Sequence, residues 1–209
     1  MKILVLGASG LTGAIVVDLS LNRGDDVVVL TRDASKFAHR RPNLHVIEGS
    51  ATSIPDIEAA LNGVDAVIHC LGIGGKGQGS TTTVVSDSVK ATLDAMTNKS
   101  VRRIVCMSNV GAGDSGTWFY NRIVLPVFLR WLKPIIEDKN RMEIALKSSS
   151  MDWVSVRLRN IVPGLESKVR TSPDGKGMGI SITTESTARF LLKQVSENVW
   201  LRKSPSVSN

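Results

Sequence analysis

The sequence predicts an α/β fold built on a doubly wound, mostly parallel sheet. Three observations support this class: short apolar segments recur along the chain, most are rich in Val and Ile without strict alternation, and helical patterns separate most of them. A lack of alternation is typical of strands that are buried on both faces. Strands that alternate with helices in this way form parallel sheets with a layer of helices on each side.

The expected elements follow one another at short intervals. Strands are predicted at Lys2–Leu6, Asp26–Leu30, Leu44–Ile47, Ala66–Cys70, Arg103–Met107 and Trp153–Arg157. Helices are predicted at Leu11–Leu21, Ile54–Leu61, Thr82–Thr97 and Glu137–Lys147. Residues 1–209 form a single domain in this interpretation, since that length suffices to bury a full core. The tail, residues 202–209, is expected to fray.

The composition is that of a soluble protein, with 42% hydrophobic and 22% charged residues. The apolar stretches are too short, or too interrupted by Arg, to span a bilayer, and Met1 begins the first strand without room for a signal peptide. We therefore expect a cytoplasmic protein. Cys70 and Cys106, the only cysteines, lack Cys-x-x-Cys spacing. They are interpreted as reduced core thiols, with a redox pair as the alternative.

The net charge of +7 is unevenly distributed. Residues 1–100 hold nine Lys or Arg and ten Asp or Glu, whereas residues 101–209 hold seventeen and nine. A basic C-terminal half suits an anionic substrate or a polyanion, but a solvated basic surface is the simpler interpretation. No nucleic-acid-binding motif is present, and His39, His45 and His69 lack the spacing of metal ligands. His69 is expected in a strand and the other two at the surface.

The stretch "GASGLTG", Gly7 to Gly13, follows the first predicted strand and opens the first predicted helix. Gly7, Gly10 and Gly13 permit a tight turn, a close approach of backbone to a pyrophosphate and close packing of helix on strand. The N-terminus of the helix adds a favourable dipole for an anion. The stretch is therefore predicted to bind a nucleotide, the alternative being a structural turn.

The end of the second predicted strand distinguishes the two nicotinamide dinucleotides. An NAD enzyme usually has Asp or Glu there to bind the ribose 2′-hydroxyl, but this chain has Arg32, in "VVVLTRDASKF". A guanidinium is a planar, permanent cation suited to a 2′-phosphate, and Ser35, Lys36 or Arg40 could add donors. We expect NADP rather than NAD as cofactor, and we expect Asp33 to face solvent or to cap the next turn.

Five stretches resemble a known family: "GASGLTG", "LTRDASKF", "VDAVIHCLG", "VRRIVCMSNVGAG" and "DWVSVRLRNIVPG". They are similar to the atypical short-chain dehydrogenase/reductase group, and within it to the small NAD(P)H-binding proteins related to flavin reductase/biliverdin-IXβ reductase. The resemblance covers nearly the whole chain. It implies a Rossmann-type fold with a short C-terminal substrate region, in a protein that is a monomer or a weak homodimer.

The resemblance also implies cofactor contacts at matching positions. The glycine turn would contact the pyrophosphate, Arg32 and Lys36 the 2′-phosphate, and Arg159-Asn160-Ile161 the nicotinamide. The full implied set is Gly7, Ser9, Gly10, Leu11, Thr12, Gly13, Arg32, Lys36, Ser50, Ala51, Leu71, Gly72, Ile73, Met107, Arg159, Asn160 and Ile161. Of these, Ser50 and Ala51 would lie near the adenine, although many relatives have Asp in place of Ser50, and residues 71–73 would lie along the ribose.

The Tyr-x-x-x-Lys pair of active dehydrogenases is missing. Tyr120 is the only tyrosine, and Val124 stands four residues after it. Carbonyl reduction by that pair, and the sugar epimerase and dehydratase functions, are therefore not expected. Ser108 is the candidate catalytic residue, because it lies just past the fifth predicted strand and because the matching serine of the flavin reductase relatives faces nicotinamide and substrate. A serine that caps the next turn is the alternative.

The stretch "GTWFYNRIVLPVFLRWLKP", Gly116 to Pro134, holds five of the nine aromatic residues and belongs to a lid-like insertion at about residues 113–136. As a lid it would contact a flat substrate through Trp118, Tyr120 and Arg122. An amphipathic helix packed on the core, or a docking segment for a partner or membrane surface, are the alternatives. Lys139, in the following helix, is interpreted as solvated, with a role in place of the missing lysine as the alternative.

These observations predict an NADPH-dependent reductase that transfers hydride to a flat acceptor, either a flavin, a biliverdin-like or a quinone-like molecule. Such a transfer needs little beyond two flat rings held in contact, and water can deliver the proton. No metal is expected to take part. The alternative is a non-catalytic NADP-binding protein that acts as a redox sensor, regulator or assembly scaffold.

Overall fold

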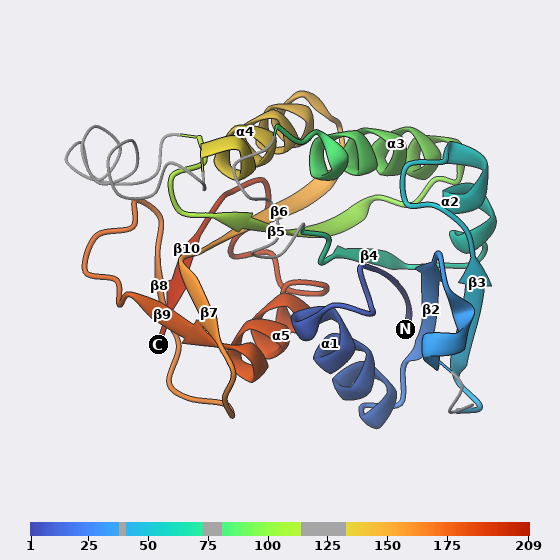
Figure 1. Ribbon diagram of the computed structural model, residues 1–209, viewed down its shortest axis with the longest axis horizontal. Helices are drawn as coiled ribbons and strands as arrows, with labels where there is room; N and C mark the ends of the chain where they lie inside the picture. Colours follow the sequence, from blue (N-terminus) through green and yellow to red (C-terminus); the bar gives the residue numbers. More distant parts are fainter. Residues whose placement is uncertain (38–40, 73–80, 114–132) are drawn as a thin grey trace.

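The computed structural model of the protein describes residues 1–37, 41–72, 81–113 and 133–209 (Figure 1). Its main sheet has eight strands in the order β3-β2-β1-β4-β5-β6-β10-β8. Neighbouring strands are parallel except for β8, which runs antiparallel to β10. The strands of this sheet are β1 (Lys2–Leu6), β2 (Asp26–Thr31), β3 (Leu44–Glu48), β4 (Ala66–His69), β5 (Arg103–Asn109), β6 (Asp152–Leu158), β8 (Arg170–Ser172) and β10 (Ser206–Ser208). A separate parallel pair consists of β7 (Asn160–Val162) and β9 (Ser181–Thr183).

Helices cover both faces of the main sheet (Figure 1). On one face α1 (Leu11–Asn22) packs against α5 (Thr184–Lys193). On the other face α3 (Val84–Asn98) lies between α2 (Ile54–Ala60) and α4 (Lys133–Ser148). A short 3-10 turn, η1 (Ala34–Phe37), follows β2. This architecture confirms the predicted doubly wound, Rossmann-type α/β fold.

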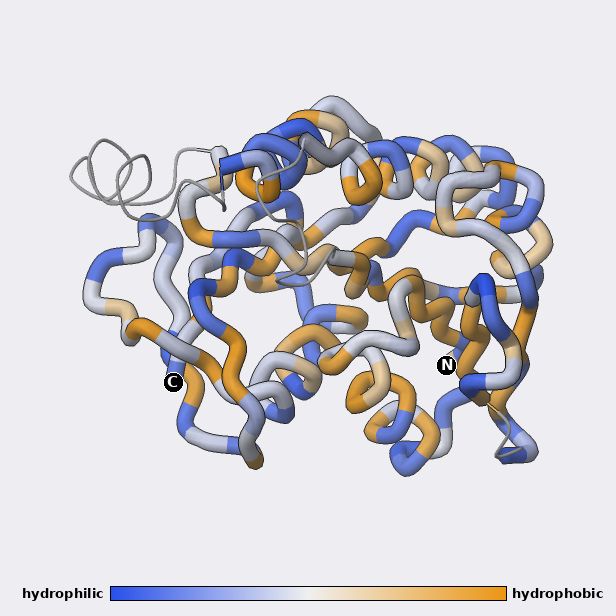
Figure 2. Tube along the Cα trace, in the orientation of Figure 1, coloured by the Kyte–Doolittle hydropathy of each residue, from blue (hydrophilic) through white to orange (hydrophobic). Residues whose placement is uncertain are grey.

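The strand β1 shows how one strand contributes to two cores. Leu4 and Leu6 pack toward α2, α3 and α4, whereas Ile3 and Val5 pack toward α1 and α5. All four side chains are fully buried. Because helices cover both faces, neither face of the strand needs polar side chains after Lys2, and Ile3–Leu6 is apolar throughout. Figure 2 shows this concentration of hydrophobic residues in the central strands.

The predicted strands and helices are all present, with ends that differ by at most four residues. The expectation that the tail frays is wrong. Ser206–Ser208 forms β10, which lies between β6 and β8, and Val207 is only 1% exposed. The backbone N–H of Arg157 donates to the carbonyl of Pro205 at 2.8 Å, so main-chain pairing anchors a segment with a single apolar core residue. A hydrophobic pattern of one residue does not predict a strand.

The two cysteines are free, with Cys106 buried and Cys70 partly exposed. Burial raises the pKa of both thiols, that of Cys70 to about 12. A thiol with a raised pKa is a poor nucleophile, which agrees with the interpretation as core thiols rather than a redox pair. His69 lies buried in β4 and His45 is exposed, as expected, while His39 lies outside the described residues.

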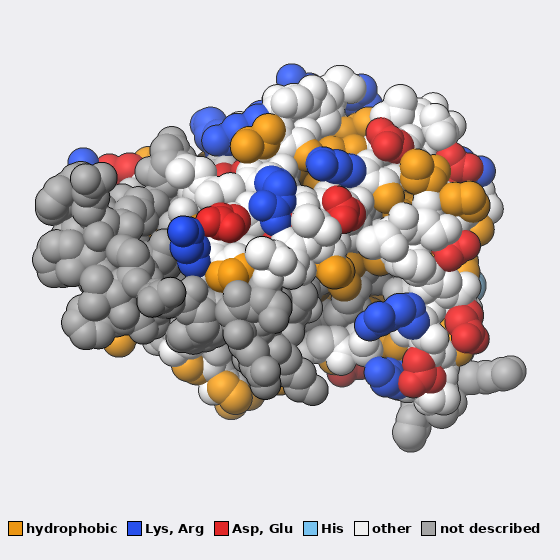
Figure 3. Space-filling model, turned by 45° about the horizontal axis from the view of Figure 1, so that its top comes forward, with side chains coloured by type: hydrophobic (Ala, Val, Ile, Leu, Met, Phe, Trp, Pro, Cys, Tyr) orange, Lys and Arg blue, Asp and Glu red, His pale blue; other side chains and the backbone are white. Residues whose placement is uncertain are grey.

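On the surface that carries α3 and α4, basic and acidic side chains are interspersed (Figure 3). Within the part of the chain that the structure describes, no helix is long and apolar enough to cross a membrane.

Candidate active site

The turn between β1 and α1 requires glycine at two positions. Gly7 has a φ of +79°, and a Cβ built there would lie 2.8 Å from the backbone nitrogen of Leu71. A Cβ on Gly13 would overlap the carbonyl oxygen of Gly7. The turn therefore lies directly against the chain that leaves β4, and α1 begins as close to β1 as backbone atoms allow.

The N-terminus of α1 is open to solvent. Gly10 is the N-cap residue, no described side chain bonds to this helix end, and the first turn contains no acidic residue. Ser9, Gly10 and Leu11 are exposed, while Thr12 and Gly13 are buried. The first N–H groups of a helix have no partner within the helix, and the helix dipole favours an anion beside them. These features fit the pyrophosphate of a dinucleotide.

Arg32 follows β2, the strand next to β1, at the same edge of the sheet. Its side chain is exposed and forms no ion pair with any residue of the described ranges. The neighbouring Asp33 caps the turn η1, as one of the expectations had it: its Oδ1 accepts from Ser35 N at 3.1 Å and from Ser35 Oγ at 2.5 Å. The bond from the Ser35 hydroxyl lowers the pKa of Asp33. Lys36 is exposed, with its Nζ 3.9 Å from Asp33.

The remaining predicted cofactor residues lie at this edge as well. The N–H of Ser50, after β3, donates to Asp56 at 2.8 Å, so a carboxylate is present beside the position where relatives have Asp. Ala51 and Leu71 are partly exposed and Gly72 is exposed, each following a strand of the main sheet. Of the predicted site residues, Ile73, Trp118, Tyr120 and Arg122 lie outside the described residues, as does most of the insertion predicted at about residues 113–136.

Arg159, Asn160 and Ile161 follow the carboxyl end of β6, where β7 begins. Asn160 is exposed, and the other two residues are partly buried. Met107 lies in β5 with its side chain partly buried. The structure thus brings these residues to the carboxyl ends of β5 and β6, next to those of β1 and β4 in strand order. Ligands of open α/β sheets bind at this edge.

The interpretation of Lys139 as a solvated residue is wrong. Its side chain, on α4, is 4% exposed, and its Nζ donates to the carbonyl of Met107 at 2.7 Å and to that of Leu71 at 3.1 Å. Burial lowers the pKa of Lys139 to about 8. Lys139 therefore joins the chain after β4 to β5, at two residues of the predicted cofactor set.

Ser108 lies in β5 and not just past it, and its hydroxyl is committed to a buried carboxylate. Its Oγ donates to Glu143 at 2.8 Å, and Ser155 Oγ donates to the same carboxylate oxygen at 3.0 Å. Arg157 bonds both oxygens of Glu143, through Nε at 3.0 Å and Nη2 at 2.7 Å. Glu143 and Arg157 are 1% and 3% exposed. This Glu143 cluster, Ser108, Glu143, Ser155 and Arg157, joins β5, β6 and α4.

Sequence reasoning missed the inward-facing charges of α4. Ile136, Met142 and Leu146 are its buried apolar residues. Asp138, Lys139 and Glu143 fall on the same side by helical spacing and are 1%, 4% and 1% exposed. Helical spacing places these charges beside the core positions, but spacing alone does not show whether a charged side chain there is buried or turned to water. Buried charges of this kind must be paired.

His69, in β4, has a lowered pKa that favours the neutral imidazole. Burial lowers the pKa of His69 to about 3, and its Nε2 lies 2.9 Å from Ser88 Oγ. Within the described ranges, no group of His, Cys, Asp or Glu side chains is arranged to hold a metal ion. The site thus combines a glycine turn with an open helix N-terminus, the exposed cation of Arg32 and a buried charged cluster.

Known proteins resemble this chain over its full length. A curated relative, UPF0659 protein YMR090W of Saccharomyces cerevisiae, is 24% identical over 223 residues, which cover 100% of this chain and 93% of the relative. Among solved structures, ChuY, described as an anaerobilin reductase from Escherichia coli O157:H7, has a TM-score of 0.81 at 18% identity, covering 100% of this chain and 97% of ChuY. A short-chain dehydrogenase/reductase from Veillonella parvula DSM 2008, solved in complex with NADP, has a TM-score of 0.79 at 16% identity, covering 100% and 94%.

The sequence of this chain matches a known protein family over most of its length. The model of a family described as NAD(P)H-binding matches residues 7–198, nearly the whole chain. The match begins at Gly7, the first residue of the turn that opens α1, and the solved structures share the fold. This protein therefore belongs to the NAD(P)H-binding family, in agreement with its resemblance to the atypical short-chain dehydrogenases/reductases.

Proposed function

We propose that the protein is an NADPH-dependent reductase that transfers hydride to a flat acceptor, a flavin, a biliverdin-like or a quinone-like molecule. The observation that carries the proposal is the combination of an open α1 N-terminus and, at the same sheet edge, an exposed Arg32 that forms no ion pair with any described residue. The turn residues Gly7 to Gly13 would hold the pyrophosphate through backbone N–H groups. Bound NADPH supplies the hydride, so the chain has only to position it.

Arg32 supports NADP rather than NAD. The guanidinium of Arg32 is exposed and has no carboxylate partner among the residues that the structure describes, so its donors are available for a 2′-phosphate, which it can bind bidentately. Lys36 adds a second cation, since its 3.9 Å separation from Asp33 is a weak, exposed contact. The solved relative with bound NADP agrees with this choice.

Ser108 would act as a hydrogen-bond acceptor. Because its single hydroxyl proton is donated to Glu143, only its lone pairs remain for a cofactor or substrate. A carboxamide N–H of nicotinamide or a ring N–H of the acceptor fits such a group. The chain departs here from a serine that donates to a carbonyl oxygen, and this departure agrees with the missing Tyr-x-x-x-Lys pair.

Lys139 would act as a positioning residue. It holds the carbonyls of Leu71 and Met107, so it sets the spacing between two segments of the predicted cofactor set. A charged Lys has three N–H donors and two are used here, which leaves one for a hydroxyl or carbonyl of the bound ligand. The neutral amine still has two donors, enough for both carbonyls.

A second candidate function is a non-catalytic NADP-binding protein: a redox sensor, regulator or assembly scaffold. The observation in its favour is the Ser108 hydroxyl, which is bonded to Glu143 in a residue only 2% exposed. A serine held in this way can stabilise the fold without contacting a substrate.

Cofactor choice is tested by Arg32→Ala. We expect NADPH binding to weaken by roughly 1.5–3 kcal/mol, the contribution of hydrogen bonds to a charged group, while NADH binding stays nearly unchanged. Calorimetric titration of both cofactors measures this, with Arg170→Ala as the matched control, since Arg170 is an exposed arginine on β8. An equal loss for both cofactors would contradict the NADP assignment.

Turnover separates the two candidate functions. NADPH oxidation is measured with FMN, FAD, riboflavin, biliverdin or quinones as acceptor. The natural chain and the Trp118→Ala/Trp131→Ala variant are compared in the same assay. A reductase with an aromatic lid should show a raised Michaelis constant for its acceptor in this variant and an unchanged NADPH affinity. Tight NADPH binding without oxidation by any acceptor favours the sensor or scaffold.

A further inference from the structure

A small pocket lies beside β6, away from the dinucleotide-binding turn. It encloses about 230 Å³ between the last turn of α4 and the segment that leads into β10. Trp153 forms part of its wall at the start of β6, where it pairs with Ile104. Ser108 pairs with Arg157 at the other end of the same two strands. The Trp153 end of the pocket is therefore remote from the sheet edge that carries Gly10 and Arg32.

The charges of the pocket are of one sign. Four cationic residues line it, Lys147, Arg157, Arg202 and Lys203, and none of its lining residues is Asp or Glu. Two carboxylates lie nearby: Glu143 bonds Arg157, and Asp152 lies 3.9 Å from Arg202 but 3.5 Å from Arg102. The remaining positive charge lies in a concave surface, where it attracts anions.

The lysines of this pocket have spare donors. Lys147 forms no hydrogen bond or ion pair with any described residue. Lys203 Nζ reaches only the carbonyl of Val199, at 3.4 Å. Arg202 bonds the carbonyls of Met151 and Ser150 through Nε and Nη2, which leaves its Nη1 donors.

Two serine hydroxyls next to these cations are also unsatisfied. Ser204 Oγ, in the pocket wall, and Ser206 Oγ are buried and have no hydrogen-bond partner in the described part of the chain. Ser206 is 1% exposed and lies two residues after Ser204, outside the pocket lining. Buried hydroxyls are normally paired, so an orphan in a pocket wall indicates a missing acceptor.

We propose that this pocket binds a small oxyanion, a phosphate or carboxylate group. Its volume of about 230 Å³ is below the roughly 300–1,000 Å³ of drug-sized sites, so the ligand is the oxyanion alone or one carried on a single ring. Trp153 and Trp200 supply apolar walls for such a ring. The inference does not rest on the proposed reductase function.

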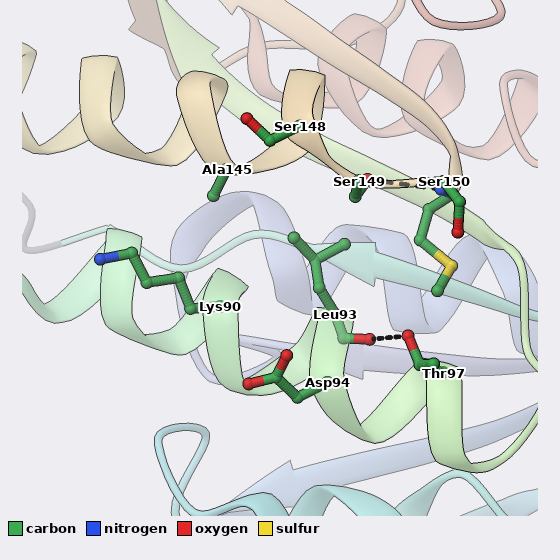
Figure 4. A pocket seen from close by; sticks show the side chains of 9 residues that line it. Lys90, Leu93, Asp94, Thr97, Ala145, Ser148, Ser149 and Ser150 are labelled. Atoms are coloured by element: carbon green, nitrogen blue, oxygen red, sulfur yellow. Dashed lines mark hydrogen bonds between the residues drawn. The ribbon is translucent and has the colours of Figure 1, made fainter.

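A second groove of the molecule differs from this pocket in its charges and in its hydroxyl groups. The groove between α3 and α4 (Figure 4) contains Lys90, but Asp94 lies in the same wall, and Thr97 Oγ1 donates to the carbonyl of Leu93 at 2.9 Å. Its charge is balanced and that hydroxyl is satisfied. Lys90 is therefore a matched control for the lysines of the oxyanion pocket.

To test the proposal, the full chain is titrated with inorganic phosphate and with benzoate at constant ionic strength. Calorimetry and tryptophan fluorescence measure the binding. We expect binding by the natural chain and a loss of at least tenfold in Lys147→Gln/Lys203→Gln. Lys90→Gln should bind as the natural chain does. Ser204→Ala should weaken binding severalfold with an unchanged melting temperature, which separates the site from a folding effect.

Arg32→Ala distinguishes this pocket from the dinucleotide site. The proposal requires that this variant keeps phosphate binding. Loss of binding in Arg32→Ala alone, full binding by Lys147→Gln/Lys203→Gln, or no binding of either probe by the natural chain would each overturn it. None of these outcomes bears on NADPH oxidation, so failure here leaves the reductase proposal standing.

Discussion

Two helices begin at the carboxyl edge of the sheet, and their N-termini differ. α1, after β1, starts at Gly10 without a side-chain cap. α3, after β4, is closed by Asp138 of α4, whose carboxylate accepts from Val85 N at 3.0 Å and from Ser86 N at 3.1 Å. Both helices have a positive N-terminal end. At α1 this end is open to an external anion, whereas at α3 the carboxylate of Asp138 neutralises it.

The same contrast extends over the whole edge. Near α1, Arg32 and Lys36 are exposed, and Lys36 has only a weak contact with Asp33 at 3.9 Å. On the inward face of α4 three charged side chains are buried and hydrogen-bonded: Asp138 to the N-terminus of α3, Lys139 to two carbonyls and Glu143 to Arg157. The open side can bind a charged ligand, and the closed side can hold strands β4, β5 and β6 at a set spacing. Each difference can be tested separately.

The largest effect is expected from Glu143→Ala. Removal of this carboxylate leaves Arg157 buried without its partner, so the free energy of unfolding should fall by about 3–5 kcal/mol. Urea unfolding measures the loss. Glu137→Ala is the control, since Glu137 lies on the same helix with an exposed contact to Lys133 at 3.9 Å. A loss as small as that of the control would show that the cluster is not a stabilising unit.

Gly13→Ala should close the open side. The added Cβ would overlap the carbonyl oxygen of Gly7 and force α1 away from β1. Overpacking of this kind costs about 3 kcal/mol of stability, and NADPH affinity should fall as the turn is displaced. Gly24→Ala is the comparison, because nothing lies within 4 Å of a Cβ there, although its φ of +86° adds its own strain. Unchanged NADPH binding in Gly13→Ala would argue against the α1 turn as the cofactor site.

Asp138→Ala should open the closed side. The N–H groups of Val85 and Ser86 lose a charged acceptor, which should cost roughly 2 kcal/mol in the free energy of unfolding. Asp138→Asn keeps one acceptor oxygen, so it should retain about half of the stabilisation that Asp138→Ala removes. Thermal or urea unfolding ranks the two variants. Equal stability of the Ala and Asn forms would mean that the cap contributes little.

The smallest effect concerns pH. The pKa of Lys139 is lowered to about 8 in the folded protein from 10.5, mainly by burial. Between these values the unfolded chain keeps a proton that the folded chain has lost, so the contribution of Lys139 to stability rises with pH. The slope is at most ~1.4 kcal/mol per pH unit. Below pH 8 the lysine is charged in both states and adds no slope.

The cysteines act in the opposite direction, since burial raises the pKa of Cys70 to about 12 from 9.0. Above pH 9 the unfolded chain loses thiol protons that the folded chain retains, so stability falls. Subtraction of the Lys139→Met unfolding curve from that of the natural chain removes this contribution. The difference should increase in favour of the natural chain between pH 8 and 10. A flat difference would show that Lys139 has an ordinary pKa.

Local sequence patterns predicted the sheet, the glycine turn after β1 and the cation after β2. Those features depend on local patterns: apolar runs without alternation define buried strands, and glycines next to a strand define the turn. Gly7, Gly13 and Arg32 lie where the pattern placed them, because each acts through its own backbone or through its exposed side chain.

The buried charges of α4 and the ordered tail depend on contacts between residues that are distant in the chain. Asp138, Lys139 and Glu143 belong to a helix whose polar residues could equally have faced water, and their partners lie 53, 32 and 14 residues away in the chain. β10 has one buried apolar residue and is a strand because β6 and β8 supply backbone partners on both sides. A buried charge or a polar strand is stable only through such distant partners, and no local pattern encodes them.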